Sequence, residues 1–237
     1  MVKQIIAVEA VENTETGSEE VSEATCPQLD VWCDEVSLPR EAKTAQEIVL
    51  NLKETIREHN LPSLSAPQIG YNKRIFVVNF NGDLRSFINP VITKADGITL
   101  SDEVCPSLPG RRFVRPRNNT IVVAYQTPLG RAEVHKFLGL AAIVIQHELD
   151  HLNGLLLSDV ALEVDSHWDE ATQEERDEVL AAYLDSIDLK KKVLHEQIED
   201  NKDLKQLSDG IRFLEAVASG EVKLAPDAKV LKADFRK

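Results

Sequence analysis

The sequence has few cysteines, few aromatic side chains and no long apolar run. Its three cysteines, Cys26, Cys33 and Cys105, cannot all pair with one another, and Cys26 and Cys33 match no common metal-binding spacing, so no disulfide framework is expected. The apolar stretch at 137–145 is too short to cross a bilayer and contains Gly139. The N-terminus lacks the order of charged, apolar and small residues that marks a signal peptide. We therefore expect a cytoplasmic protein in a reducing compartment, without a membrane partner.

Basic residues are also scarce relative to acidic ones. The sequence has 27 lysines and arginines against 40 aspartates and glutamates, for a formal net charge of −13. Residues 36–164 are nearly balanced, with thirteen acids and fourteen bases, so the excess acid lies in residues 1–35 and 165–237. Neutralising phosphates requires clustered lysine and arginine. Direct binding to nucleic acid is therefore not expected.

The charge pattern suggests a core with two acidic extensions. We expect a catalytic domain over 1–165, whose first 35 residues form an acidic N-terminal extension, followed by an acidic helical extension over 166–237. Residues 9–25 are polar and weakly periodic, which predicts a loop or disorder. Residues 168–218 predict two or three helices whose charged faces suit packing on the core or on a partner rather than catalysis.

Periodicity predicts helices and short strands within the core. Apolar residues at helical spacing predict a helix over about 41–59, with Pro39 near its start. Residues 61–70 predict a loop because they are rich in proline and serine. Strands are predicted at 74–80, 86–93, 119–126 and 130–137, with turns at Asn81-Gly82 and Pro128 to Gly130. A second helix is predicted over 138–153, where Gly154 suits a left-handed C-terminal cap.

The most informative stretch is QHELDHLNG, residues 146–154, within the second predicted helix. His147 and His151 are four residues apart, so a helix places them on one face, where both can bind one metal ion, with Glu148 beside them. This spacing is typical of hydrolases that depend on zinc or iron. A catalytic site of this kind needs at least one more protein ligand and an open coordination position.

The residues alone leave two sources for the third ligand. In the metzincin proteases the motif continues as HExxHxxGxxH, but Leu157 stands where the last histidine belongs. Glu163 or Glu170 could serve a protease with a glutamate ligand, although neither lies on a clear second helix. Upstream, Cys105 in DEVCPSLPG offers a thiolate, which is a strong ligand for zinc or iron.

Three segments of the chain follow one another in a familiar order: LSAPQIG (64–70), EVCPSLPG (103–110) and QHELDHLNG (146–154). Together they resemble the three motifs of the peptide deformylases, GxGLAAxQ, EGCLS and QHExDHLxG. The third motif is matched at every fixed position and the second at its Glu, Cys and Ser. The first is matched at Leu64, Ala66 and Gln68, and the resemblance covers about residues 35–160.

The resemblance implies an α+β fold, with short antiparallel strands around a central metal-binding helix and the C-terminal helical extension added. It also implies an enzyme that removes the formyl group from N-formylmethionyl peptides and releases formate. Cys105, His147 and His151 would hold one divalent ion, Fe(II) by family precedent, with Zn, Ni or Co as substitutes. Water activated by the metal would attack the formyl carbonyl, with Glu148 as general base and Gln68 as oxyanion donor.

The implied partners are nascent N-formylmethionyl peptides, with a transient contact to the ribosome. Leu140, Ile143 and Val144 lie one and two turns before the first histidine and would wall an apolar pocket for the methionine side chain. The alternative for these three is plain core packing at helical spacing. Ser63 and Arg112 are the other candidates for substrate contact.

The densest positive run follows the cysteine motif and consists of Arg111, Arg112, Arg115 and Arg117. These arginines could bind carbonyl groups of the peptide or the surface of the ribosome. They could equally pair with acids of the same chain, such as Asp150.

The sequence departs from the family pattern in two places. Pro106 follows the metal-binding cysteine, where the family supplies a backbone N–H to the oxyanion, and proline has no N–H to give. In the first motif Leu61 and Ser63 replace both glycines, and Pro62 removes a further N–H. Val104 also replaces the glycine before the cysteine. We expect a missing oxyanion donor and an altered substrate cleft.

Three other functions stay open at this point. A deacylase or amidase with a different acyl substrate is favoured by the altered first motif. A weakly active homologue could use its acidic extensions for binding or regulation, but a protein without catalysis needs no base such as Glu148 beside its metal. An HExxH protease lacks a well-placed third ligand.

Overall fold

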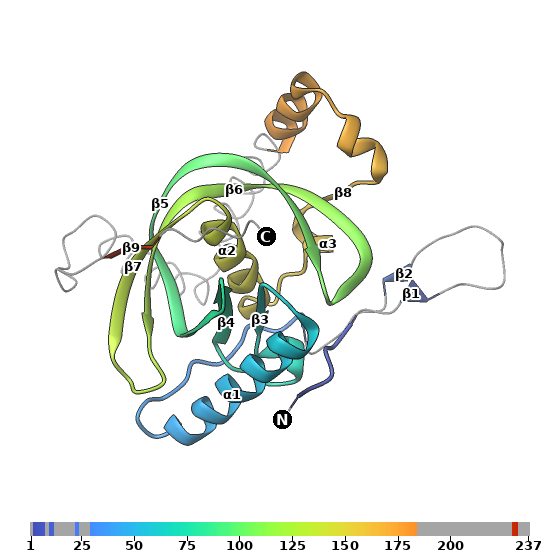
Figure 1. The fold of residues 1–237 in the computed structure, drawn as a ribbon. Helices are drawn as coiled ribbons and strands as arrows, with labels where there is room; N and C mark the ends of the chain where they lie inside the picture. The colour runs from blue at the N-terminus through green and yellow to red at the C-terminus, as the bar shows by residue number, and fades with distance from the viewer. Residues whose placement is uncertain (1, 8–9, 12–21, 24–28, 184–228, 232–237) are drawn as a thin grey trace, which may run out of the picture.

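The computed structural model describes residues 2–7, 10–11, 22–23, 29–183 and 229–231. Its elements, in chain order, are β1 (Ala10–Val11), β2 (Ser22–Glu23), α1 (Ala42–His59), β3 (Ser63–Ser65), η1 (Pro67–Ile69), β4 (Ile75–Phe80), β5 (Asp83–Cys105), β6 (Leu108–Gln126), β7 (Ala132–Leu138), α2 (Leu140–Leu152), α3 (Leu157–Val160), β8 (Leu162–Glu163), η2 (Ser166–Glu170) and β9 (Lys229–Leu231). Figure 1 shows α2 enclosed by the arc of β5 and β6, with α1 outside it.

One sheet carries the fold and has the strand order β3-β4-β5-β6-β7-β9, with β8 paired to β6. All of its pairs are antiparallel except β7 with β9, which run parallel. β3 stands at one end of this order, so one of its edges is not paired with any described strand. An edge strand of this kind keeps backbone donors and acceptors for another extended segment.

The β5–β6 hairpin is much longer than the sequence predicted. β5 has 23 residues and β6 has 19, whereas only 86–93 and 119–126 were predicted as strands. The remainder was missed because it is rich in charge, glycine and proline and lacks a clear apolar alternation; cross-strand pairing decides its conformation. The register is interrupted between Glu103 and Cys105 and at two earlier places, and such bulges bend and twist a strand. The bends accompany the curved path around α2 in Figure 1.

Helix α1 confirms the predicted helix over 41–59. Its buried apolar residues follow one face and pack on β3, β4 and β5: Ala45, Ile48, Val49, Leu52 and Ile56. The helix ends at Asn60, which adopts a left-handed conformation at φ 50° and donates its N–H to the carbonyl of Ile56. Asparagine tolerates this conformation better than most residues.

Helix α2 lies within the predicted range 138–153 and presents its apolar face to the main core. The residues of this face are Ala141, Ala142, Ile145, Leu149 and Leu152. The scarce aromatic residues gather against it: the rings of Phe76 and Phe87 stack at 4.7 Å, and Tyr125 and Phe137 contact Phe87. Concentrating the few large rings in one cluster gives α2 a rigid support.

The end of α2 is held closely by the segment that precedes α1. Gly154 has φ +68°, as the predicted cap requires, and a Cβ added to it would lie 2.8 Å from backbone atoms of Asp30 and Val31. The guanidinium of Arg74 donates at 3.0 Å to the carbonyl of Leu152, one of the last carbonyls of the helix. Position 154 therefore requires glycine for two reasons: its φ is positive, and a Cβ would have no room beside the backbone of Asp30 and Val31.

The remaining predictions have mixed outcomes. The strands predicted at 74–80 and 130–137 are confirmed as β4 and β7. The loop predicted at 61–70 is wrong in part, because it contains β3 and the 3₁₀ helix η1, whose backbone groups pair with β4 or within the turn. Within 9–25 the short strands β1 and β2 pair with each other, and the rest lies outside the described residues.

The acidic C-terminal region is described only at its start and near its end. Residues 173–183 are helical, as predicted, and residues 184–218 of the predicted helices lie outside the described part of the chain. Among the described residues, no helix combines the length and apolar character needed to span a bilayer.

Candidate metal centre

The two histidines of the motif lie on the face of α2 that is turned toward the end of β5. His147 and His151 are one helical turn apart, and their ring centroids are 5.0 Å from each other. Their side chains are largely buried, and the apolar face of the same helix is fixed in the core. The helix therefore orients both imidazoles before any ligand binds.

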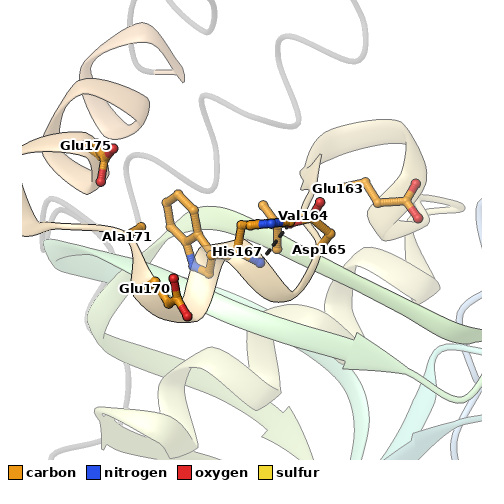
Figure 2. Close-up of a pocket in the computed structure, with 8 residues that line it drawn as sticks. Glu163, Val164, Asp165, His167, Glu170, Ala171 and Glu175 are labelled. Atoms are coloured by element: carbon orange, nitrogen blue, oxygen red, sulfur yellow. Dashed lines mark hydrogen bonds and ion pairs between the residues drawn. The ribbon is translucent and has the colours of Figure 1, made fainter.

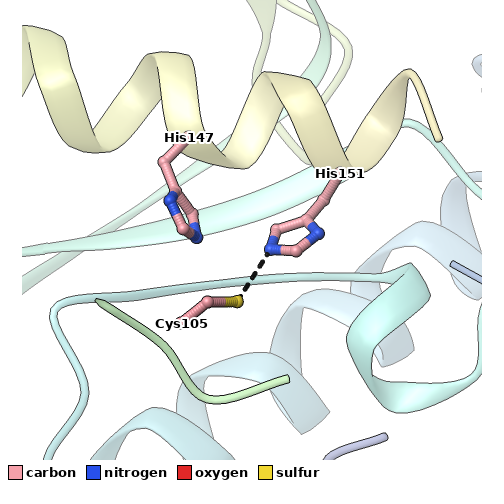
Figure 3. A group of neighbouring side chains, drawn as sticks. All are labelled: Cys105, His147 and His151. Carbon is pink, nitrogen blue, oxygen red and sulfur yellow. Dashed lines mark hydrogen bonds between the residues drawn. The ribbon is translucent and has the colours of Figure 1, made fainter. Parts of the chain in front are cut away.

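Cys105 reaches the same point from the last residue of β5. Pro106 and Ser107 form the turn that joins β5 to β6, and Cys105 pairs with Leu108 across it. The Sγ atom of Cys105 lies 3.3 Å from Nε2 of His151. Figure 3 shows these two side chains facing each other. One ligand atom from each of Cys105, His147 and His151 can be chosen so that all three lie within 4.8 Å of one another.

This donor set fits a divalent transition metal. Metal–sulfur and metal–nitrogen bonds of about 2.3 Å and about 2.0 Å place sulfur and nitrogen roughly 3.5 Å apart around a tetrahedral ion. The 3.3 Å between Cys105 and His151 is close to that separation. Three protein ligands leave a coordination position open, which is the arrangement of catalytic rather than structural sites. Soft thiolate and imidazole ligands accommodate several divalent ions.

The electrostatic environment of Cys105 suits metal binding. Burial disfavours the thiolate of Cys105, but the imidazoles of His151 and His147 outweigh burial and hold the pKa of Cys105 well below its ordinary value. Burial also disfavours the imidazolium of His147, yet Cys105 and Glu103 raise the pKa of His147 well above its ordinary value. A metal ligand must be a thiolate, so the environment of Cys105 prepares it for that role.

Glu103 orients the first histidine. Its Oε2 lies 2.9 Å from Nδ1 of His147, which leaves Nε2 of the imidazole for the metal. Arg117 donates to both oxygens of Glu103 at 2.7 Å and 2.8 Å, and also to Asp150 at 2.6 Å. Burial raises the pKa of Glu103, but Arg117 and His147 outweigh it and hold that pKa well below its usual range.

Sequence reasoning assigned no role to Glu103. The available signal was the match to the glutamate of the second motif; in the structure Glu103 and Cys105 are two residues apart in β5 and share its buried face. The pairing of Arg115 and Arg117 with Asp150, at 2.7 Å and 2.6 Å, confirms the alternative in which the arginine run is neutralised within the chain.

Glu148 lies next to the ligands in a buried position. Its Oε1 accepts a hydrogen bond of 2.6 Å from the hydroxyl of Ser63, which comes from β3. Its Oε2 is buried and has no partner among the described residues. Burial is the main reason that the pKa of Glu148 is raised, although His147 and His151 oppose the shift.

Gln68 approaches the metal centre from η1. Its side-chain oxygen accepts from the backbone N–H and the hydroxyl of Ser65, at 2.9 Å and 2.8 Å. Its amide nitrogen then donates to the hydroxyl of Ser107 at 3.2 Å and faces Sγ of Cys105 at 3.7 Å. The two serines therefore fix which way the amide points, and sequence reasoning had not singled them out.

A cavity of about 600 Å³ opens beside the metal centre. The five candidates for substrate contact all line it: Ser63, Arg112, Leu140, Ile143 and Val144. Four residues that depart from the family pattern also line it: Leu61, Pro62, Val104 and Pro106. His147 and Glu148 complete one wall, whereas Gln68 is not among the lining residues. The guanidinium of Arg112 is held at the rim by Asp102 and by Asp169.

A second hollow, of about 760 Å³, lies at η2 and shares no lining residue with the first. Figure 2 shows its acidic wall, which includes Glu163, Asp165 and Glu170. Glu163 is bound by Arg111 at 2.7 Å, and neither Glu163 nor Glu170 belongs to the metal-binding group found in the described part of the chain. A protease site with a glutamate ligand is therefore not formed by these residues.

A helix-borne histidine pair, a thiolate ligand and a buried carboxylate inside an α+β fold define a metal-dependent hydrolase. The family model described as polypeptide deformylase matches residues 19–166. A peptide deformylase from Dictyoglomus turgidum is 41% identical over 118 residues, which cover 50% of this chain and 77% of that protein. One from Thermodesulfovibrio yellowstonii is 38% identical over 144 residues, covering 56% and 87% respectively.

Solved structures agree with the sequence relatives. The peptide deformylase of Thermotoga maritima is 27% identical with a TM-score of 0.57, over 67% of this chain and 97% of that one. A probable peptide deformylase from Synechococcus phage S-SSM7 is 33% identical with a TM-score of 0.52, over 56% and 92%. This chain belongs to the peptide deformylase family, and it is a deformylase with a Cys/His/His metal site.

Proposed function

We propose that this deformylase acts on peptides that begin with N-formylmethionine, with Glu148 as general base and Gln68 as an oxyanion donor. The observation that carries the proposal is Oε2 of Glu148, a buried oxygen beside His147 on the cavity wall that has no hydrogen-bond partner among the described residues. An unpaired buried carboxylate oxygen is costly, so its place in a native protein calls for a reason. Accepting a proton from water next to the metal is the role that fits it best.

Within the chain, Glu148 would accept one proton and later give it up again. When bound at the three ligands, a divalent ion would act as a Lewis acid and lower the pKa of water toward neutrality. Glu148 would take a proton from the water that attacks the formyl carbon and pass it to the amine nitrogen as the C–N bond breaks. The products are a free α-amino group and formic acid, which ionises to formate.

Gln68 would stabilise the negative charge that develops on the formyl oxygen. Ser65 and Ser107 hold its amide, so the N–H is oriented before substrate binds, and no reorganisation is needed during the reaction. Pro106 cannot supply the backbone donor that the family pattern has next to the cysteine. Gln68 would therefore carry more of the oxyanion stabilisation than in a relative with both donors.

The cavity and the edge of β3 that is not paired with a described strand would bind the peptide. Leu140, Ile143 and Val144 give the cavity an apolar wall suited to a methionine side chain. A peptide backbone could pair with β3, the edge strand that carries Ser63, and Arg112 at the rim could meet its carbonyl groups. A fold relative from Acinetobacter baumannii has been solved with Met-Ala-Ser bound, which makes formyl-Met-Ala-Ser a suitable probe.

We further propose Fe(II) as the native ion and the cytoplasm as the location. The thiolate and imidazole donors accept Fe(II) as well as Zn, Ni and Co, so metal analysis must decide among them. Neither of the two described cysteines, Cys33 and Cys105, forms a disulfide, which suits a reducing compartment. A transient contact with the ribosome would bring nascent chains to the cavity.

The residues 166–237 would form a separate acidic extension beyond the catalytic domain.

The direct test is the Glu148→Gln variant of protein purified without oxygen. We expect it to keep one metal ion per chain and to release formate from formyl-Met-Ala-Ser at least 10²-fold more slowly than the parent, because the proton acceptor is gone. Glu47→Gln, an exposed change on α1, should match the parent. Turnover near the parental rate in Glu148→Gln would overturn the assignment of the base.

A second candidate substrate is a peptide with a different acyl group, such as acetyl. It is favoured by the altered first motif, in which Leu61 and Ser63 line the cavity where the family pattern has glycines. The same assay with acetyl-Met-Ala-Ser distinguishes the two. If acetate is released with a higher kcat/KM than formate, the enzyme prefers the acetyl peptide and the proposed formyl substrate is wrong.

A further inference from the structure

The hydroxyl of Ser63 contacts the carboxylate that we assign as the general base. Ser63 Oγ donates to Oε1 of Glu148 at 2.6 Å, and the two side chains are 7% and 2% exposed. Hydrogen bonds to a charged carboxylate are short and roughly twice as strong as neutral ones. The other carboxylate oxygen, Oε2, has no partner among the residues that the structure describes. The two oxygens of Glu148 are therefore in different environments.

Both ends of this contact are anchored in regular structure. Ser63 is the first residue of β3 and pairs with Val78, and the carbonyl of the preceding Pro62 accepts at 2.7 Å from the N–H of Asn79. Glu148 lies in the middle of α2, whose apolar face is in the core. The hydrogen bond thus joins the edge of the sheet to the metal-binding helix, on the wall of the cavity.

We propose that Ser63 is a positioning residue that holds Oε1 of Glu148 and so reserves Oε2 for the proton transfer. The terminal torsion of a glutamate is broad and roughly two-fold, so an unheld carboxylate can rotate and exchange its oxygens. With Oε1 held, Oε2 takes the proton of the attacking water and returns it to the amine nitrogen as the C–N bond breaks. This inference rests on the proposed role of Glu148.

A glycine, which the first deformylase motif has at this position, offers no hydroxyl. Ser63 was predicted to contact substrate; it lines the cavity, and its hydroxyl is directed to Glu148. The serine therefore adds to this chain a constraint on the base that its family pattern does not contain. Its effect should appear in the rate of the chemical step and not in peptide affinity, because the contact is made within the enzyme.

The test compares Ser63→Ala and Ser63→Thr, with metal content, kcat and KM measured on formyl-Met-Ala-Ser. Ser63→Ala should lower kcat about tenfold, the size expected for losing a hydrogen bond to a charged group, with KM within about twofold of the parent. Ser63→Thr keeps the hydroxyl and suits a strand, so it should restore most of kcat. Ser86→Ala, an equally buried serine on β5, should leave kcat unchanged.

The outcomes separate this inference from the proposed function. If Ser63→Ala fails to fold, Ser63→Gly provides the same loss of hydroxyl with the residue of the family motif. An unchanged kcat in Ser63→Ala or Ser63→Gly, or a raised KM with kcat intact, would overturn the positioning role of Ser63. The role of Glu148 as base is tested separately, by Glu148→Gln. Turnover retained in Glu148→Gln would instead overturn the proposed role of Glu148 as the base, on which this inference rests.

Discussion

Oε2 of Glu103 lies 2.9 Å from Nδ1 of His147, and this contact links the β5–β6 hairpin to the metal-binding helix. The side chain of Glu103 is 6% exposed, and that of its second partner Arg117 is 3% exposed. Glu103 and Arg117 therefore form a buried ion pair whose charged groups are hydrogen-bonded. A buried charge without such partners would be strongly destabilising. The contact also determines which nitrogen of His147 is left for the metal.

The first prediction concerns this contact. Glu103→Gln should weaken metal binding about 10–100-fold, because the imidazole loses the carboxylate that orients it. It should also lower the free energy of unfolding by about 3 kcal/mol, because Arg117 loses a buried partner. Metal competition and urea unfolding measure the two effects. Asp83→Asn, in an exposed pair with Arg85 at 3.4 Å, should change the unfolding energy by less than about 0.5 kcal/mol.

The second prediction concerns the oxyanion donor. Pro106→Leu adds a backbone N–H in the turn after Cys105 and should raise kcat by a factor on the order of 10², the usual effect of one such donor. Pro109→Ala, an exposed proline on β6, controls for the loss of a rigid residue and should leave kcat as it is. The measurement is steady-state release of formate. An unchanged kcat in Pro106→Leu would show that this donor does not matter here.

The third prediction concerns stability at alkaline pH. Burial raises the pKa of Cys33 from 9.0 to about 11, although Arg74 opposes the shift. A group whose pKa is higher in the folded protein contributes its stability below the unfolded pKa and loses it as the pH rises through the folded value. The free energy of unfolding should therefore fall between about pH 9 and pH 11. Cys33→Ala should show a smaller fall over that window, and parallel curves would contradict the assignment.

The fourth prediction concerns the glycine that closes the motif. Gly154→Ala should lower the free energy of unfolding by more than about 2 kcal/mol, because its Cβ would lie 2.8 Å from the backbone of Asp30. Gly82→Ala is the matched control, since its φ is also positive at +96° and nothing lies within 4 Å of the added Cβ. It should cost about 1 kcal/mol. Equal losses in the two variants would show that the close approach does not contribute.

The sequence by itself determined the chemistry of the site and the two main helices. His147 and His151 at helical spacing, Cys105 in its motif and the order of the three motifs predicted the metal ligands before any fold was known. Local periodicity predicted α1 and α2 closely, because an amphipathic helix carries its signal within a few turns. The excess of acidic residues and the scarcity of cysteine supplied only expectations, namely no direct nucleic-acid binding and a reducing compartment.

Only the tertiary structure decided how those residues are supported. The long β5–β6 hairpin was missed because its pairing depends on residues far apart in the chain, and its outer part lacks a local pattern. The contacts of Glu103 with His147 and of Ser63 with Glu148 join residues 44 and 85 positions apart. No sequence window contains both partners of such a contact. Spacing along the chain can therefore select the ligands, whereas their orientation is fixed by packing between the sheet and the helix.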